Sequence, residues 1–186
     1  FLAPVESLAR HGRVGPTARA VVVYASVLRA KEAAGLERAT GAGAFSPTGF
    51  ARDRFQRFAE LAAIQDSYLA VARRYGSADQ ARQIVELGQS PQSEAVGRLR
   101  TVAARAALDG GPGMDPLEWF RVSTGRIDAM KVIEDAFSQD LTAVIATAAE
   151  EARRRLMLVG GIVLAVTLLA AVAAWLAARS ITRPLK

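Results

Sequence analysis

The sequence predicts an all-α protein: an up-down-up-down four-helix bundle whose last helix is continuous with a transmembrane helix. The chain of 186 residues is rich in Ala, Leu, Arg, Glu and Gln, which are good helix formers, and it lacks the sustained alternation of apolar and polar residues typical of strands. Breakers followed by capping residues divide it into long segments. Within these segments apolar residues recur at spacings of three and four, as the packing of nearly antiparallel helices requires.

Glycines bound the first two predicted helices. We expect the first over residues 16–42, ending where Gly41 and Gly43 interrupt the pattern, with a loop through residues 46–49. The second is expected over residues 51–75, before Gly76. Its core stripe contains one polar residue and reads Phe55, Phe58, Ala62, Gln65, Leu69, Ala72.

The last two predicted helices begin with capping signals. Residues 77–80 (Ser-Ala-Asp-Gln) have the spacing of a capping box and start the third, which we expect to kink at Pro91 because proline lacks an amide hydrogen. The loop over residues 109–113 ends it. Asp115, Pro116 and Glu118 then supply the cap, the first-turn proline and the capping acid of the fourth. Its stripe reads Ile127, Met130, Glu134, Phe137, Leu141, Val144, Ala148.

No breaker separates the fourth helix from residues 156–178, which lack every charged residue, Asn and Gln. As a helix this segment is about 35 Å long, enough to cross a bilayer. We therefore expect a domain over residues 1–155, a transmembrane helix over 156–178 and a linker over 179–186. Because the sequence begins at Phe1 without a signal segment, we also expect it to be a piece of a longer protein with an earlier transmembrane helix.

Composition argues against several functional classes. The 24 Lys and Arg are interspersed with 18 Asp and Glu, without the basic block typical of nucleic-acid binding. With no cysteine and one histidine, we expect no metal site, and we expect no cofactor. The glycine-rich loop over residues 110–113 lacks the following Lys and Ser or Thr of a phosphate loop. Because no nucleophile and base set is present either, we expect the chain not to be an enzyme.

The core stripe of the first helix turns polar in its second half, where Lys31 and Arg38 lie around Gly35. Burying an unpaired guanidinium costs several kcal/mol, so Arg38 needs a partner. That partner is either a diffusible anion or an internal acid such as Glu32, Glu37 or Asp128.

Arg126 of the fourth helix is the matching candidate. It lies 30 residues, or about 45 Å of helix, before Leu156, and 30 residues back from Arg38 lies Leu8. If an earlier membrane helix ends near Leu8, the two arginines lie at one level. They then either clamp a planar oxyanion, with Gly35 and Gly125 leaving room, or belong to a structural ion-pair network.

Other polar residues have two possible roles each. Gln65 either donates to an anion or bridges backbone or water, and Lys31 either neutralises a ligand or reaches solvent. Ser123 and Thr124 either complete the shell of a ligand or are exposed hydroxyls. Trp119 is either a packing residue or a ligand contact.

Four segments carry a resemblance to a known family: residues 31–45 (Lys-Glu-Ala-Ala-Gly-Leu-Glu-Arg-Ala-Thr-Gly-Ala-Gly-Ala-Phe), residues 65–69 (Gln-Asp-Ser-Tyr-Leu), Trp119-Phe120, and residues 126–128 (Arg-Ile-Asp). They resemble the nitrate- and nitrite-sensing NIT domain of bacterial receptors. The resemblance covers about residues 17–150. It implies a helical domain in which arginines of an early and a late helix coordinate nitrate or nitrite. Arg38 matches the early arginine, and Arg126 is its late partner. The predicted ligand-binding residues are Lys31, Gly35, Arg38, Gln65, Ser123 and Arg126.

Residues 179–185 (Arg-Ser-Ile-Thr-Arg-Pro-Leu) resemble the start of a HAMP linker, the cytoplasmic relay that follows the last membrane helix of many bacterial receptors. The resemblance implies a receptor of the methyl-accepting chemotaxis type in the inner membrane, with residues 1–155 in the periplasm. Such a receptor is expected to be a homodimer, with a signalling module farther along the same chain. The alternative is a ligand-free helical module that dimerises or docks a partner in a receptor histidine kinase or cyclic-dinucleotide enzyme.

Overall fold

The computed structural model describes residues 15–44, 52–109 and 114–182, and within these ranges the secondary structure is helical, without a strand. The helices are α2 (Pro16–Ala44), α3 (Arg52–Tyr75), α4 (Ala78–Gly88), α5 (Pro91–Asp109) and α6 (Pro116–Thr182). The chain divides into two compact units, with the boundary between Val144 and Ile145. The first unit is a bundle, and the second contains the rest of α6.

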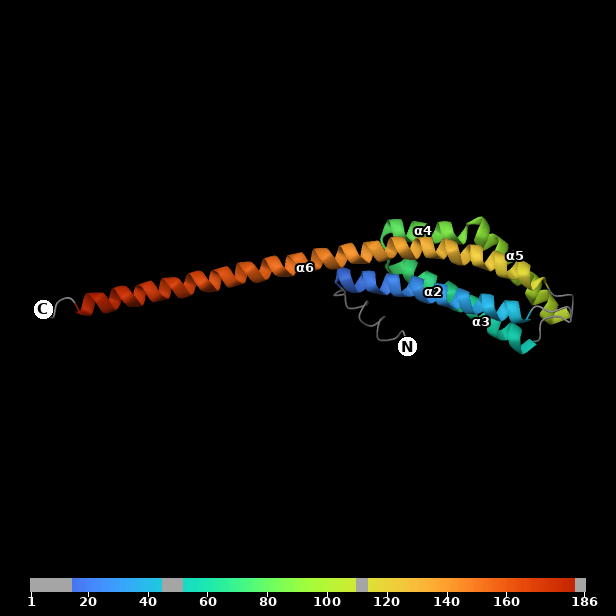
Figure 1. Ribbon diagram of the computed structural model, residues 1–186, viewed down its shortest axis with the longest axis horizontal. Coiled ribbons are helices and arrows are strands. Elements are labelled where there is room, and N and C mark those ends of the chain that lie inside the picture. The colour runs from blue at the N-terminus through green and yellow to red at the C-terminus, as the bar shows by residue number, and fades with distance from the viewer. Residues whose placement is uncertain (1–14, 45–51, 110–113, 183–186) are drawn as a thin grey trace. The chain divides into compact units, whose positions relative to one another are not determined.

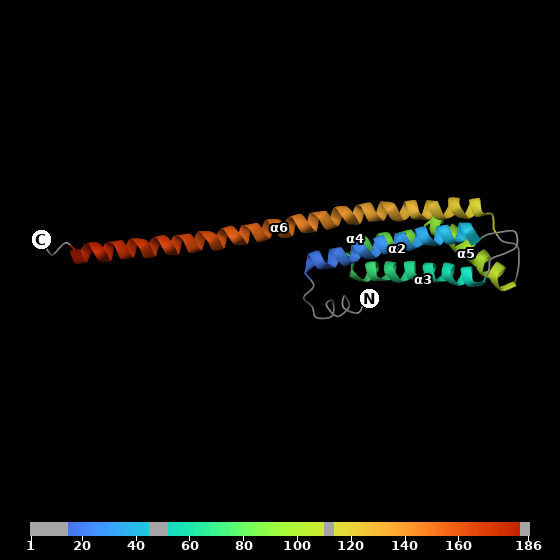
Figure 2. The ribbon, with the colours of Figure 1, turned by 60° about the horizontal axis from the view of Figure 1, so that its bottom comes forward.

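The bundle has the predicted up-down-up-down course, with α4 and α5 together forming its third member (Figures 1 and 2). α3 packs along α2 and also contacts α4 and α5. Met130 and Phe137 of α6 share a core with Val23 and Val27 of α2. The all-α bundle expected from the apolar stripes is thereby confirmed.

The bundle core consists of two apolar clusters. The larger one includes Ala34 of α2, Ala72 of α3 and Met130 of α6. The smaller one is built around Phe58 of α3 and Trp119 of α6, whose ring centroids are 5.1 Å apart. Between these clusters α3 contains the buried Gln65, and α6 contains the buried Ser123 and Arg126, so a polar layer interrupts the apolar core.

The third predicted helix is two helices, so the expectation of a single kinked helix was wrong. α4 ends at Gly88 and α5 begins at Pro91, where a missing amide hydrogen costs nothing because first-turn amides lack helical partners. The Ser90 hydroxyl accepts a hydrogen bond from the Ser93 amide (3.2 Å), which caps the new helix. At the other end of α4, Ser77 and Gln80 form the predicted capping box.

The first helix is longer than predicted, because Gly41 continues it instead of ending it. A Cβ at Gly41 would overlap the indole of Trp119, 2.9 Å from Cδ1 and closer to Nε1. The indole Nε1 also donates a hydrogen bond to the Arg38 carbonyl oxygen (2.9 Å). Gly41 therefore serves close packing of α2 against α6, and of the two roles considered for Trp119 the structure shows the packing one.

In the second unit, every side chain described from residue 145 to residue 179 is exposed, and from Leu156 onward most of these side chains are apolar. This part of α6 is long and apolar enough to cross a membrane, by length and composition. The predicted boundaries at residues 155 and 178 stay predictions. The predicted loop at 46–49, most of the loop at 109–113 and the last linker residues, 183–186, lie outside the described residues.

Candidate functional site

The polar layer of the bundle contains a cluster of four residues from four helices: Glu37 of α2, Gln65 of α3, Arg100 of α5 and Arg126 of α6. We call it the arginine cluster. Glu37 is only 2% exposed, and its carboxylate accepts two hydrogen bonds from Arg100, from Nε to Oε1 (2.6 Å) and from Nη2 to Oε2 (2.7 Å). This is the paired geometry in which a guanidinium binds a carboxylate most strongly.

Gln65 is the centre of the arginine cluster and is fully buried, at 0% exposure. Its Nε2 donates to Glu37 Oε2 (2.7 Å) and to the Leu61 carbonyl oxygen (3.0 Å). Its Oε1 accepts from Arg100 Nη2 (3.1 Å) and also from Arg126 Nη1. One amide oxygen is therefore held between two guanidinium groups.

Arg126 is buried, with 6% of its surface exposed. Among the described residues, its hydrogen-bond acceptors are both uncharged: Gln65 Oε1 and the Ser93 hydroxyl, which lies 3.3 Å from Nε. Burial and then the nearby Arg100 charge lower the pKa of Arg126 below its ordinary value, although Glu37 and the exposed Asp66 oppose this effect. The cluster thus has two guanidinium charges and one carboxylate charge.

Arg38 has different partners from Arg126. Its Nη1 donates to the Thr124 hydroxyl (2.9 Å), and its guanidinium carbon lies 4.8 Å from the centroid of the Phe120 ring. Thr124 and Arg126 are two positions apart on α6 and therefore about 200° apart around the helix axis. The structure does not bring the two arginines onto one partner, so the predicted clamp stays a prediction.

The remaining predicted site residues lie in separate settings. Lys31 forms an ion pair with Glu134 of α6. The Ser123 hydroxyl donates to the Trp119 carbonyl oxygen of its own helix (2.6 Å). A Cβ at Gly35 would meet no atom within 4 Å, so there is open space beside this residue. Of the six predicted residues, the structure joins Gln65 and Arg126 directly.

Comparison with known protein families gives one finding. The family model described as NIT, nitrate and nitrite sensing, matches residues 2–142. The chain belongs to the NIT family. No curated protein and no solved structure matched the chain. The family assigns this NIT domain to nitrate and nitrite sensing, a role in signal transduction and not in catalysis.

Sequence reasoning missed Arg100 and did not find the true partner of Glu37 in the NIT domain. A signal was available in α5, where Ser93, Val96, Arg100, Ala103 and Ala107 follow the spacing of three and four that marks a core stripe. Val96 and Ala103 are buried as this stripe requires. An arginine between them could have been recognised as a second cation facing the core.

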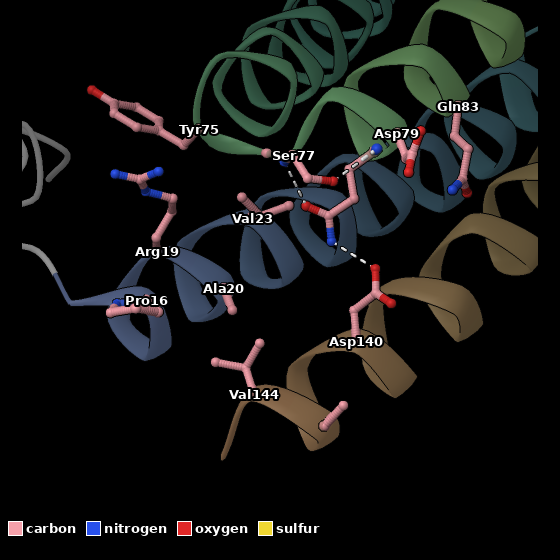
Figure 3. Close-up of a pocket in the computed structure, with 13 residues that line it drawn as sticks. Pro16, Arg19, Ala20, Val23, Tyr75, Ser77, Asp79, Gln83, Asp140 and Val144 are labelled. Carbon is pink, nitrogen blue, oxygen red and sulfur yellow. Dashed lines mark hydrogen bonds between the residues drawn. The ribbon is translucent and has the colours of Figure 1, made fainter. Parts of the chain in front are cut away.

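The NIT domain also has an open cleft of about 770 Å³ where α2 begins and α3 meets α4 (Figure 3). Arg19, Tyr75 and Asp140 contribute to its wall, and Gln80 Nε2 donates to Asp140 Oδ2 (2.8 Å) across it. None of the six predicted site residues, nor Arg100 or Glu37, is among the described residues that line this cleft. The candidate site is therefore the arginine cluster and not this cleft.

Proposed function

We propose that this chain is the sensor domain and final membrane helix of a bacterial inner-membrane receptor that binds nitrate or nitrite in the periplasm. The observation that carries the proposal is Arg126, a buried guanidinium with uncharged hydrogen-bond partners inside a NIT domain. A buried cation without a paired carboxylate gains most from a ligand of opposite charge.

The chemistry of the anion suits such a site. Nitrate and nitrite are planar and singly charged, and a guanidinium can donate two parallel hydrogen bonds to two of their oxygens. In this proposal Arg126 and Gln65 bind the anion. Arg38, Lys31, Gly35 and Ser123 are the other candidates for the ligand's surroundings.

The proposed signal travels along α6. This helix contains both Arg126 and the apolar segment at residues 156–178 and continues into the HAMP-like residues. Helix shifts of about 1–2 Å are a common form of signal, and a ligand drives one only by binding one arrangement more tightly, typically by about 1–3 kcal/mol. We propose a homodimeric chemotaxis receptor whose output module follows on the same chain.

One set of contacts favours a second candidate, a ligand-free module that dimerises or docks a partner. Glu37 is paired with Arg100 and Lys31 with Glu134, as in a structural network. In that case Arg126 contributes to the network only through its hydrogen bonds to Gln65 and Ser93. Its removal then changes the stability of the protein and does not change anion binding.

Titration of the whole chain in lipid nanodiscs with sodium nitrate and sodium nitrite distinguishes the two. The sensor proposal expects saturable heat and a rise in the unfolding temperature, since a ligand at 100 times its dissociation constant stabilises by about 2.7 kcal/mol. Arg126→Met should lose both responses and Arg38→Met should weaken them.

The matched control is Arg29→Met, which removes an exposed arginine of α2 that pairs with Glu32. It should bind as the unaltered chain does. Absence of heat and thermal shift at millimolar nitrate and nitrite, or full binding by Arg126→Met, would overturn the sensor proposal.

A further inference from the structure

The oxygen shared by Arg100 and Arg126 lies in a position that suits an anion. Gln65 Oε1 accepts hydrogen bonds from guanidinium groups on two helices, α5 and α6. Carboxylate and nitrate oxygens are preferred acceptors for such groups, because hydrogen bonds between charged partners are about twice as strong as neutral ones. Gln65 Oε1 is uncharged and is therefore a weaker acceptor than an anion oxygen would be in the same place.

The charges of the cluster differ from those of a self-sufficient network. Arg100 and Arg126 contribute two positive charges, and Glu37 contributes one negative charge. One singly charged anion brings the sum to zero. A doubly charged anion leaves an uncompensated negative charge in a buried site, which is costly because charges are poorly solvated there.

We propose that Arg100 is the second guanidinium ligand of the anion bound at Arg126, and that Glu37 makes the site selective for singly charged anions. The proposal rests on the proposed function only for the position of the ligand at Arg126. The anion takes the place of Gln65 Oε1 between the two guanidinium groups, and the Gln65 amide turns so that its Nε2 donates to the anion.

Glu37 has two effects in this arrangement. It fixes the Arg100 guanidinium through two hydrogen bonds, so that Arg100 Nη2 also reaches the shared oxygen. It also cancels one of the two positive charges. Removing only the charge of Glu37 should therefore raise the affinity for doubly charged anions more than that for singly charged ones, because electrostatic attraction scales with the product of the charges.

Two variants of the whole chain in nanodiscs test the proposal by calorimetry. Glu37→Gln raises the cluster charge by one and keeps the shape of the side chain. The double variant Glu37→Gln/Arg100→Gln keeps the cluster charge of the unaltered protein, leaves no unpaired carboxylate and lacks the second guanidinium. Unfolding temperatures without anion confirm that each variant is folded.

The anions are the sodium salts of nitrate, nitrite, chlorate, formate and sulfate at constant ionic strength. In the unaltered chain the singly charged anions should bind more tightly than sulfate. In Glu37→Gln the preference for nitrate over sulfate should fall at least about tenfold, a change of about 1.4 kcal/mol. In the double variant the affinity for nitrate should fall at least about tenfold, since one guanidinium remains.

The outcomes separate this proposal from the proposed function. Binding of chlorate or formate without nitrate or nitrite would refute nitrate sensing and leave the monoanion site standing if the variants respond as expected. If the double variant binds nitrate as tightly as the unaltered chain, or if Glu37→Gln keeps the same preference for nitrate over sulfate, the roles of Arg100 and Glu37 are overturned. The proposed function is not affected by either result. Failure of the unaltered chain to bind any of the five anions would overturn both.

Discussion

Two charged sites in the bundle use the same kinds of residue in different proportions. Lys31 of α2 and Glu134 of α6 form an ion pair with equal and opposite charges. The arginine cluster joins four helices and has one carboxylate for two guanidinium groups. The comparison indicates how a buried network can be tested for a ligand: a balanced pair needs no further ion, whereas an unbalanced cluster gains from one.

The largest expected effect comes from unbalancing the balanced pair. Lys31→Met leaves the Glu134 carboxylate largely buried without its cation and should lower the free energy of unfolding by about 3 kcal/mol, at the lower end of the range for broken buried pairs. Urea unfolding followed by circular dichroism measures the loss. Lys31→Met/Glu134→Leu should recover most of it, and a double variant no more stable than Lys31→Met would show that the pair does not act as a unit.

The second prediction balances the unbalanced cluster. Ser93→Asp places a carboxylate beside Arg126, whose Nε now donates to the Ser93 hydroxyl. The affinity for nitrate should fall about thirtyfold, or about 2 kcal/mol, because the cluster then has its own counter-ion. Ser93→Asn has the same shape without the charge and serves as the control. Equal affinities of the Asp and Asn variants would show that net charge does not determine binding.

A third prediction changes packing and leaves both charged sites intact. Gly41→Ala forces a Cβ against the Trp119 indole and should cost about 1.5 kcal/mol of stability, as overpacking does. Gly35→Ala on the same helix meets no atom within 4 Å and should be neutral or stabilising, because alanine favours a helix. Thermal unfolding measures both. Equal stabilities of the two variants would contradict the close fit at Gly41.

The smallest expected effect is at the start of α4. Ser77→Ala removes the side-chain half of the capping box and should cost about 1 kcal/mol in urea unfolding. Ser67→Ala, which removes an exposed hydroxyl bonded to the Ala63 carbonyl oxygen in mid-helix, should cost little. Nitrate affinity should be unchanged in Ser77→Ala. A lower affinity would mean that binding depends on bundle stability and not on charge alone.

Much of the fold was predictable because its signals are local. Ser77 and Pro116 indicated where α4 and α6 begin. The apolar stripes that contain Phe58 and Met130 indicated which helix faces are buried. Gly41 was misread because local helix propensity opposes a mid-helix glycine, whereas its packing against Trp119 depends on a residue far along the chain.

The candidate site was predictable only in part. Gln65 and Arg126 stood out as polar residues on helices expected to pack in a core. Their contacts depend on how each helix is rotated about its axis, which spacing alone does not determine. For that reason the sequence predicted that Arg38 and Arg126 share a ligand. In the structure the Arg38 guanidinium contacts Thr124 and Phe120, on another side of α6.

The contact between Trp119 and α2 limits which movements are open to the bundle. The indole donates to the Arg38 carbonyl oxygen and occupies the space that Gly41 leaves. A slide of α6 along α2 by a full turn, about 5.4 Å, would bring larger side chains against the ring. α2 and α6 therefore keep a fixed register where Gly41 of α2 packs against Trp119 of α6.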